Sequence, residues 1–340
     1  MVKVAVVGLG FMGKTHLGAY RKLPDVQVTA LCDPRKEILE LKSLQPVGNI
    51  RTSEAASSPG DARRFLRFEE MLAAGGFDVV DICAPTPLHA EYAIRALDAG
   101  FHVFCEKPMA LSVEEARRIL EKVERSGRLF SVGHCLRYWP AYAEVKKLLD
   151  SGRYGATRYA EFDRYSAPPR WSSDDWMNDP SRSGSAALDL HVHDADMVLY
   201  LFGPPRAIQS DGVFDPDGSI RHITTLYRYN GLLVKASGGW LASSAFGFNM
   251  RALYLLERAT IELDFSKDPT VMVYPEGDAK YALPLPEGDG YYYELKDFCE
   301  GVVRGTLSGV VTGRSAADAV RMCLLEIRSA QQGEQLIWEP

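Results

Sequence analysis

The sequence has little of several features that mark particular protein classes. Its six cysteines are scattered and form no C-x-x-C pair, so neither a zinc site nor a disulfide framework is expected. No apolar run reaches the roughly 18 residues that a membrane-spanning helix needs. The formal net charge of −6 offers no basic excess for phosphate backbones, which argues against a nucleic-acid partner. We therefore expect an ordinary globular protein with neither membrane nor nucleic acid as its partner.

The chain also lacks internal repeats, low-complexity tracts and a signal-peptide pattern. Residues 2–7 read directly as a strand, with no charged and apolar leader before them. The cysteines in apolar strands are expected to behave as small hydrophobic residues. Together these features favour a reducing, cytoplasmic location, and the length of 340 residues suggests two domains.

The pattern of secondary structure changes near residue 134. Up to that point apolar strands alternate with helices, which predicts βαβ units and a parallel sheet. From residue 135 to residue 340 longer strands follow one another, and Asn230-Gly231 is a hairpin signal, so an α+β domain with an open, mostly antiparallel sheet is predicted. Its strands are expected at 155–166, 206–214, 220–229, 232–242, 248–256, 259–265 and 270–275. The polar stretch 43–64 is expected to be a long loop or a partly frayed helix.

A glycine-rich turn, Gly8-Leu9-Gly10-Phe11-Met12-Gly13, follows the first strand and opens a helix. An acid, Asp33, lies 20 positions beyond Gly13 at the end of the second strand, which is the context of a dinucleotide-binding fingerprint. Gly8 permits the tight turn, Gly10 lets the backbone approach the pyrophosphate, and Gly13 allows close packing of helix on strand. The helix N-terminus offers N–H groups and a positive dipole end to the phosphates.

The residues that follow the second strand bear on which dinucleotide binds. Asp33 should accept hydrogen bonds from the ribose hydroxyls, and its charge repels a 2′-phosphate, which favours NAD over NADP. Arg35 leaves NADP as the less favoured alternative, because a nearby arginine can accommodate that phosphate.

A lysine stands at the end of an apolar strand, in the tripeptide Glu106-Lys107-Pro108. Ligands of open α/β sheets bind outside the carboxyl ends of the strands, so Lys107 is expected to point at whatever the dinucleotide reacts with. The following proline fixes φ and removes a backbone donor, which holds the backbone of the lysine in place.

A histidine and an aspartate form a second group, within residues 184–194. If this stretch is helical, Asp189 and His193 share a face, because residues i and i+4 are neighbours. Histidine can take or give a proton near neutral pH, and a carboxylate can orient its ring. His191 projects elsewhere and is expected to pack or to face solvent.

The same stretch can also be interpreted as a metal site. Zinc needs three or four convergent ligands, whereas the available side chains diverge around a helix, so no metal is expected. A metal-dependent hydrolase or lyase would show chelator-sensitive turnover. The side chains concerned are His191, His193, Asp189, Asp194 and Asp196.

In order and at similar spacing, these motifs resemble the glucose–fructose oxidoreductase, inositol dehydrogenase and MocA family (Gfo/Idh/MocA). The glycine turn, Glu106-Lys107-Pro108 and Asp189-x-x-x-His193 match its three signatures. The segment Ala84-Pro85-Thr86-Pro87-Leu88-His89 is similar to its nicotinamide-side loop, and residues 133–140 are similar to its domain junction. The resemblance covers essentially the whole chain.

The resemblance implies a Rossmann dinucleotide-binding domain over 1–134 and an α+β substrate-binding and oligomerisation domain over 135–340, with the active site between them. It implies an NAD(P)-dependent oxidoreductase that moves a hydride between nicotinamide and a secondary alcohol or ketone of a sugar, inositol or related cyclic polyol. A homodimer or homotetramer through the C-terminal sheet is expected. A non-catalytic sensor of dinucleotide or sugar on the same fold is the alternative.

By resemblance, Lys107 contacts the reacting oxygen and His193 exchanges its proton with help from Asp189, although either Lys107 or His193 could be the immediate proton acceptor. Residues near 185 and His191 depart from the family pattern, which leaves the substrate open. His16, His102 and His222 are interpreted as structural. Cofactor contacts are expected from Gly8, Gly10, Phe11, Met12, Gly13, Asp33, Arg35, Ala84, Pro85, Thr86, His89, Glu106 and Lys107. Substrate contacts are expected from Arg137, Tyr165, Arg170, Trp171 and Trp176.

Overall fold

The computed structural model describes residues 1–40, 43–44, 46, 48, 56–57 and 60–339. Contacts within the chain divide it into two compact units. Unit 1 comprises Met1–Cys135, Arg170–Met177 and Asp289–Val320, and unit 2 comprises Leu136–Pro169, Asn178–Gly288 and Arg321–Pro340. Within the described part of the chain, no helix is both long and apolar enough to cross a bilayer.

Unit 1 is built on a parallel sheet, whose described strands run in the order β5-β2-β1-β6-β7-β8. Apolar runs form these strands because helices cover both faces of such a sheet. In β1, every residue except Lys3 is buried. The strands are β1 (Val2–Val7), β2 (Val26–Cys32), β5 (Arg63–Phe65), β6 (Val79–Ile82), β7 (His102–Cys105) and β8 (Phe130–Val132).

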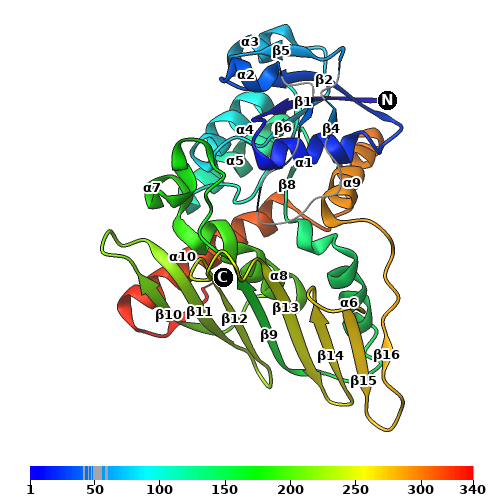
Figure 1. Ribbon diagram of the computed structural model, residues 1–340, viewed down its shortest axis with the longest axis vertical. Helices are drawn as coiled ribbons and strands as arrows, with labels where there is room; N and C mark the ends of the chain where they lie inside the picture. Colours follow the sequence, from blue (N-terminus) through cyan, green and yellow to red (C-terminus); the bar gives the residue numbers. More distant parts are fainter. Residues whose placement is uncertain (41–42, 45, 47, 49–55, 58–59, 340) are drawn as a thin grey trace. The chain divides into compact units, whose positions relative to one another are not determined.

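Helices from both ends of the chain pack on this sheet (Figure 1). Helix α9, near the C-terminus of the chain, contacts α1 and β1, and its Phe298 ring meets Phe104 of β7 edge-on at 5.4 Å between centroids. The Asp289 side chain caps α9 by accepting from the Tyr292 N–H at 2.8 Å. The helices are α1 (Phe11–Tyr20), α2 (Lys36–Leu39), α3 (Phe68–Ala74), α4 (His89–Asp98), α5 (Val113–Ser126) and α9 (Gly290–Arg304).

The strand order reverses between β1 and β6. The chain runs from β1 outward through β2 to β5, and then returns to β6 on the other side of β1 before continuing to β7 and β8. Such a reversal opens a crevice at the carboxyl ends of the two central strands, where ligands of open α/β sheets bind. The turn after β1 and the loop after β6 therefore both lie at the switch point.

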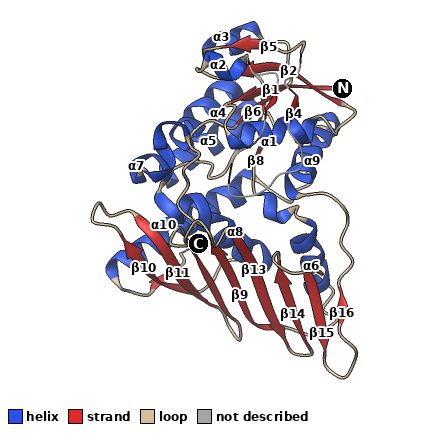
Figure 2. Ribbon diagram, viewed as in Figure 1, coloured by secondary structure: helices blue, strands red, loops and turns tan. Residues whose placement is uncertain are grey.

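Unit 2 is built on a larger, mixed sheet in the order β16-β15-β14-β13-β9-β12-β11-β10-β17. The described neighbours are antiparallel except for β9 and β12, which pair in parallel. Figure 2 shows these strands side by side as one broad sheet. The strands are β9 (Thr157–Tyr165), β10 (Ala207–Phe214), β11 (Ile220–Arg228), β12 (Leu233–Gly239), β13 (Asn249–Leu256), β14 (Ala259–Asp264), β15 (Val271–Pro275), β16 (Tyr281–Ala282) and β17 (Leu336–Ile337).

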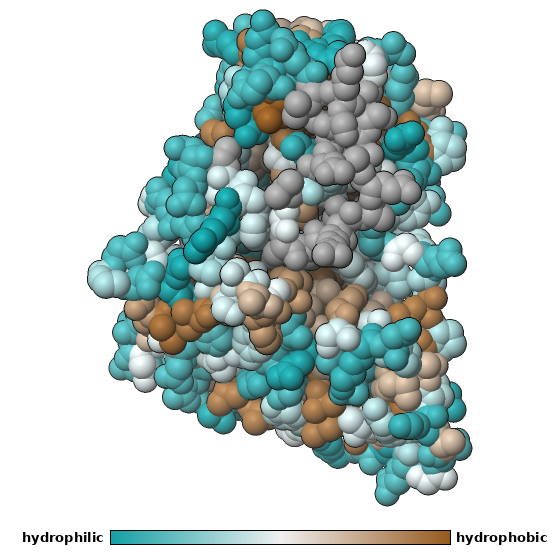
Figure 3. Space-filling view, in the orientation of Figure 1, coloured by the Kyte–Doolittle hydropathy of each residue, from teal (hydrophilic) through white to brown (hydrophobic). Residues whose placement is uncertain are grey.

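The surface character differs between the units. In the view of Figure 3, hydrophilic residues predominate around α3 and β5 of unit 1, whereas small hydrophobic areas are interspersed over the region of the unit 2 strands. The helices that contribute residues to unit 2 are α6 (Pro140–Asp150), α7 (Pro180–Ser183), α8 (Val192–Phe202) and α10 (Gly313–Gln332).

The predicted fold class is confirmed: a parallel Rossmann sheet and a mostly antiparallel sheet are both present. Two local predictions were wrong. Ser43–Leu44 and Ala56–Ser57 pair as short antiparallel strands, β3 and β4, rather than forming a loop or a frayed helix, and much of the stretch 43–64 lies outside the described residues. Ala187–His191 forms a π-helical turn, not the regular α-helix assumed for Asp189 and His193.

Candidate functional site

The glycine turn after β1 is held in a conformation that side chains would disrupt. Gly8 has φ +88°, and a Cβ there would lie 2.6 Å from the Cys83 carbonyl oxygen. A Cβ on Gly13 would lie 1.9 Å from the Gly8 carbonyl oxygen. Both contacts are far shorter than van der Waals separation, so the close approach of α1 to the turn requires glycine at these two positions.

The start of α1 fits the phosphates of a dinucleotide. Gly10 is the N-cap and supplies no side-chain cap, which leaves the first N–H groups of the helix available to an anion. Among the described residues, a Cβ built on Gly10 meets no atom within 4 Å, so the protein described here does not crowd this glycine. Phe11 and Met12, which begin the helix, are half-buried. The predicted cofactor residues of this segment therefore lie together at one helix end.

One charged residue beside this turn was missed by the sequence analysis. Lys14 lies in the second half of the first turn of α1, and burial followed by the charge of Arg35 lowers the pKa of its ammonium. Lys14 could have been recognised from the sequence, because a lysine directly after the third glycine places a cation where it can bind a phosphate group.

Asp33 and Arg35 form a bidentate ion pair at the end of β2. Arg35 Nε and Nη2 donate to the two carboxylate oxygens, each at 2.8 Å, and the Leu9 N–H donates to Asp33 Oδ2 at 2.8 Å. Burial alone would raise the pKa of Asp33, but these donors lower it below its usual value. The carboxylate is therefore ionised and tied to the glycine turn, while Arg35 stands beside it.

The loop after β6 is braced by His89. The two ring nitrogens of His89 lie 2.8 Å from the carbonyl oxygens of Ala84 and Pro108. Burial lowers the pKa of His89 despite these two acceptors. Pro85 precedes the single turn Thr86–Leu88, in which Thr86 is buried. His89 thus joins the predicted nicotinamide-side loop to the segment that carries Lys107.

Lys107 follows the carboxyl end of β7, the strand next to β6 in the sheet. Its backbone N–H donates to Glu106 Oε2 at 3.2 Å, and the Lys107–Pro108 peptide bond is cis. Glu106 was expected to touch the cofactor, but its side chain is buried and its other carboxylate oxygen, Oε1, lies 3.0 Å from His16 Nε2. A side-chain contact between Glu106 and the cofactor stays a prediction.

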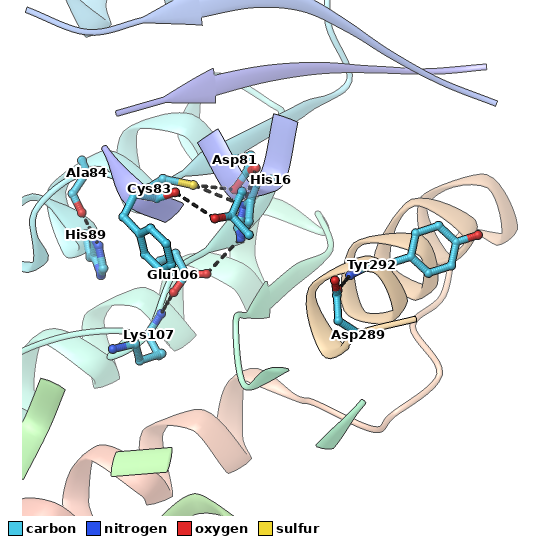
Figure 4. A network of polar contacts seen from close by, with 11 residues as sticks. His16, Asp81, Cys83, Ala84, His89, Glu106, Lys107, Asp289 and Tyr292 are labelled. Carbon is cyan, nitrogen blue, oxygen red and sulfur yellow. Dashed lines mark hydrogen bonds and ion pairs between the residues drawn. The ribbon is translucent and has the colours of Figure 1, made fainter. Parts of the chain in front are cut away.

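His16 occupies the centre of a buried polar cluster in unit 1 (Figure 4). Its Nδ1 lies 2.8 Å from Asp81 Oδ2 and 3.2 Å from Cys83 Sγ. Burial would lower the pKa of His16, but the Asp81 carboxylate and Cys83 hold it well above its usual value. The sequence analysis treated His16 as structural and did not single out Asp81. Asp81 could have been found from the sequence as a carboxylate inside an apolar strand, because a charged residue in such a buried strand requires a partner.

Unit 2 contains the predicted proton-exchanging pair. Asp189 is buried within the π-helical turn, and His193, near the start of α8, is half-buried. A π turn is wider than an α turn, and such single turns are frequent at functional sites. His191 is fully buried, with Nε2 3.1 Å from Glu326 Oε2, which matches the expectation that it packs.

Other predicted substrate residues lie in different environments. The Arg137 guanidinium is buried and donates to both oxygens of Asp196, at 2.9 and 2.6 Å. The Tyr165 hydroxyl donates to Asp163 Oδ1 at 2.9 Å, and its ring stacks on His222. The segment Arg170–Met177, which includes Trp171 and Trp176, belongs to unit 1 by its contacts. Substrate contact by any of these side chains stays a prediction.

Comparison with protein families assigns both parts of the chain. Residues 2–134 match the family described as "Oxidoreductase family, NAD-binding Rossmann fold", and residues 142–262 match the Gfo/Idh/MocA C-terminal domain. Two curated relatives are similar in sequence. Levoglucosan dehydrogenase of Pseudarthrobacter phenanthrenivorans is 33% identical over 65% of this chain and 59% of that protein. The scyllo-inositol 2-dehydrogenase (NAD(+)) of Bacillus subtilis is 32% identical over 98% of this chain and 95% of its own length.

A solved structure supports the same fold. Levoglucosan dehydrogenase in complex with NADH and levoglucosan superposes with a TM-score of 0.83 at 20% identity, covering 99% of both chains. The predicted family, enzyme class and NAD cofactor are confirmed, and the sensor alternative finds no support among these dehydrogenases. The glycine turn, the strand-end lysine and both domain matches lead to one conclusion: the chain belongs to the Gfo/Idh/MocA family of NAD-binding oxidoreductases.

Proposed function

We propose that this oxidoreductase moves a hydride between NAD and a secondary alcohol or ketone of a sugar, inositol or related cyclic polyol. The observation that carries the proposal is the position of Lys107, directly after β7 and one strand from the switch point with its glycine turn. A cation at this position suits an oxygen on which negative charge develops. The named relatives act on inositol and on levoglucosan, both ring-shaped polyols, which supports this substrate class.

Oxidation of a carbinol needs a group that takes the hydroxyl proton and a group that stabilises the oxygen. When bound, NAD supplies the acceptor for the hydride. Lys107 provides the cation near the reacting oxygen, and His193 exchanges the proton, with Asp189 orienting its ring. Either Lys107 or His193 can be the first proton acceptor. In this proposal Gly10, Asp33 and the loop from Ala84 to His89 hold the dinucleotide.

The remaining expectations extend the proposal. Trp171, Trp176 and Tyr165 would stack on the apolar face of a sugar ring, and Arg170 would donate to its hydroxyls. The division of roles between residues 1–134 and 135–340, a homodimer or homotetramer through the unit 2 sheet, and a cytoplasmic location stay predictions.

A panel of polyols tests the proposed function. The purified protein is mixed with scyllo-inositol, myo-inositol, levoglucosan and common aldoses, with NAD and NADP in parallel, and nicotinamide absorbance is followed. We expect NAD-dependent turnover with at least one cyclic polyol and a kcat/KM above about 10³ M⁻¹s⁻¹, at the low end of ordinary enzymes. Tight NAD binding without turnover of any cyclic polyol or ketone would contradict the proposal.

Replacing Asp33 by asparagine is expected to shift cofactor preference. The neutral amide no longer repels a 2′-phosphate, and Arg35 loses its bidentate partner and can bind that phosphate instead. The ratio of NADPH to NADH dissociation constants, measured by nicotinamide fluorescence, should fall by about tenfold or more. The matched control combines Asp33→Asn with Arg35→Ala and should lose the gain in NADPH affinity. An unchanged ratio in the single variant would show that Asp33 does not face the ribose.

A further inference from the structure

A continuous line of polar contacts runs from the middle of the unit 1 sheet to the backbone of Lys107. Asp81 of β6 contacts His16 Nδ1 at 2.8 Å, and His16 Nε2 contacts Glu106 Oε1 at 3.0 Å. The other carboxylate oxygen of Glu106 accepts from the Lys107 N–H at 3.2 Å. Figure 4 shows this line of contacts joining α1, β6 and the end of β7.

The charge state of His16 follows from its partners. Its Nδ1 is hydrogen-bonded to Asp81 Oδ2 at 2.8 Å, and its Nε2 lies at an ion-pair distance of 3.0 Å from Glu106 Oε1. Burial would lower the pKa of His16, but the Asp81 carboxylate and Cys83 raise it well above its usual value, which favours the imidazolium. All three side chains are buried, so a charge here is retained only because its partner is present. Burial would raise the pKa of Glu106, but contact with His16 and the charge of Lys107 lower it, which favours the carboxylate.

Gly133, after β8, lies directly against the Glu106 carboxylate. A Cβ on Gly133, after β8, would lie 2.7 Å from Glu106 Oε1, so only glycine lets the carboxylate turn inward there. The Glu106 N–H also donates to the Ile82 carbonyl of β6 at 2.9 Å, which fixes the strand end. Glu106 is thus held on both its main chain and its side chain.

A second buried glutamate stands beside this line of contacts. Glu294 of α9 has a carboxyl oxygen within 4.8 Å of both the nearest Glu106 oxygen and a His16 nitrogen. Burial first, and then the charge of Glu106, raise the pKa of Glu294 well above its usual value. The pKa values of the two glutamates are therefore shifted in opposite directions, and we place Glu294 outside the network.

We propose that Asp81, His16 and Glu106 form a positioning network that fixes the backbone of Lys107 and places a buried negative charge next to it during turnover. The inference rests on the proposed role of Lys107. The network holds Lys107 through its main-chain N–H, which donates to Glu106 Oε2.

A buried metal ion is the competing explanation for the same side chains. His16, Glu106 and Glu294 present ligand-type atoms within 4.8 Å of one another. The pKa of His16 is raised by the Asp81 carboxylate and Cys83, however, which favours the protonated ring, and a protonated ring does not bind a metal. Elemental analysis of the purified protein that found a stoichiometric metal, lost together with activity on chelation, would overturn the network.

The test compares substitutions at the two glutamates. Glu106→Gln removes the carboxylate, Glu106→Asp keeps it with a shorter reach, and Glu294→Gln replaces the neighbouring carboxyl group by an amide of similar shape. The readouts are kcat and KM for the best polyol, the NADH dissociation constant and thermal unfolding.

We expect Glu106→Gln to lower kcat by about tenfold or more while the NADH dissociation constant changes by less than about threefold. KM for the polyol should change by less than about threefold, because the network acts on the position of Lys107 in the transition state rather than on substrate binding. Glu106→Asp should restore part of kcat. Glu294→Gln should leave kcat and KM unchanged.

Several outcomes would overturn the network. One is a Glu106→Gln enzyme with kcat within about threefold of the wild type, and another is a fall in kcat accompanied by an equal loss of NADH affinity. If Glu106→Gln does not fold, Asp81→Asn, at the far end of the network, carries the same expectations with a smaller loss. Lys107→Met distinguishes the proposed function from the network. If the Lys107→Met enzyme is active, the proposed function is wrong. If it is inactive while the Glu106→Gln enzyme is unaffected, only the network is wrong.

Discussion

Replacing Lys107 by methionine is expected to lower kcat for polyol oxidation by about 10³-fold, while the NADH dissociation constant changes by less than about threefold. Methionine keeps much of the length and the apolar stem of the side chain but removes the cation. The oxygen of the carbinol would then develop charge without a nearby partner, and proton transfer would lose one of its two groups. Initial rates with the polyol identified by the panel, together with nicotinamide fluorescence titrations, measure the two effects separately.

The matched control for this substitution is Lys122→Met. Lys122 lies on α5 and pairs with Asp98 on the surface of unit 1. A surface ion pair contributes about 0–1 kcal/mol to stability, so kcat should stay within about twofold of the wild type. A Lys107→Met enzyme with similar activity to the Lys122→Met enzyme would exclude Lys107 from the reaction. Loss of NADH binding in Lys107→Met would instead assign the lysine to the cofactor.

The second large effect is expected at Gly13. A Cβ there would lie 1.9 Å from the Gly8 carbonyl oxygen, so Gly13→Ala must push α1 away from the turn after β1. Overpacking of this kind costs about 1–3 kcal/mol or more, and each kcal/mol lowers Tm by roughly 2–4 °C in a domain of this size. We expect a lower Tm, or no soluble protein, together with loss of NADH binding. Calorimetry and fluorescence titration measure both.

Two other glycines of the same region provide matched controls, because a Cβ at Gly10 or Gly18 meets no atom within 4 Å in the part of the chain that the structure describes. Gly18→Ala, inside α1, should stabilise the helix by about 0.5–1 kcal/mol and leave NADH binding unchanged. Gly10→Ala should leave Tm unchanged, since its φ of −75° suits alanine, but should raise the NADH dissociation constant by about tenfold or more. Equal NADH affinity in both alanine variants would show that no dinucleotide lies against Gly10.

Local patterns in the sequence were sufficient for the elements that local physics controls. The apolar run at 2–7 and the glycines at 8, 10 and 13 together predicted the strand and the turn that the structure contains, whereas the ion pair of Asp33 with Arg35 was not predicted. Alternating strands and helices predicted the parallel sheet, and the longer strands after residue 135 predicted the mixed sheet. Each of these features depends on residues within a few positions of one another, or on one repeated pattern.

The geometry of the Asp189 and His193 segment could not be read in the same way. The spacing of four residues suggested a shared face of a regular helix, but Ala187–His191 forms a π turn. Burial of Leu188, Leu190 and His191 against neighbouring strands and helices decides the local winding, because tertiary packing overrides helix propensity. We therefore expect the effects of substitutions around this turn on stability to follow the packing of unit 2 rather than the period of an α-helix.

The sequence alone thus determined the fold class and the glycine turn, and it singled out the lysine that we propose as the marker of the site. The tertiary structure decided the surroundings of that lysine, because Asp81, His16 and Glu106 come from three separate elements and Glu294 arrives with α9 from nearly 190 residues further along the chain. Long-range contacts leave no periodic signal in a single sequence. Only the packing of α1 and α9 with the parallel sheet explains why the pKa of Glu106 is lowered and that of Glu294 is raised, since burial, the His16 contact and nearby charge act differently on the two.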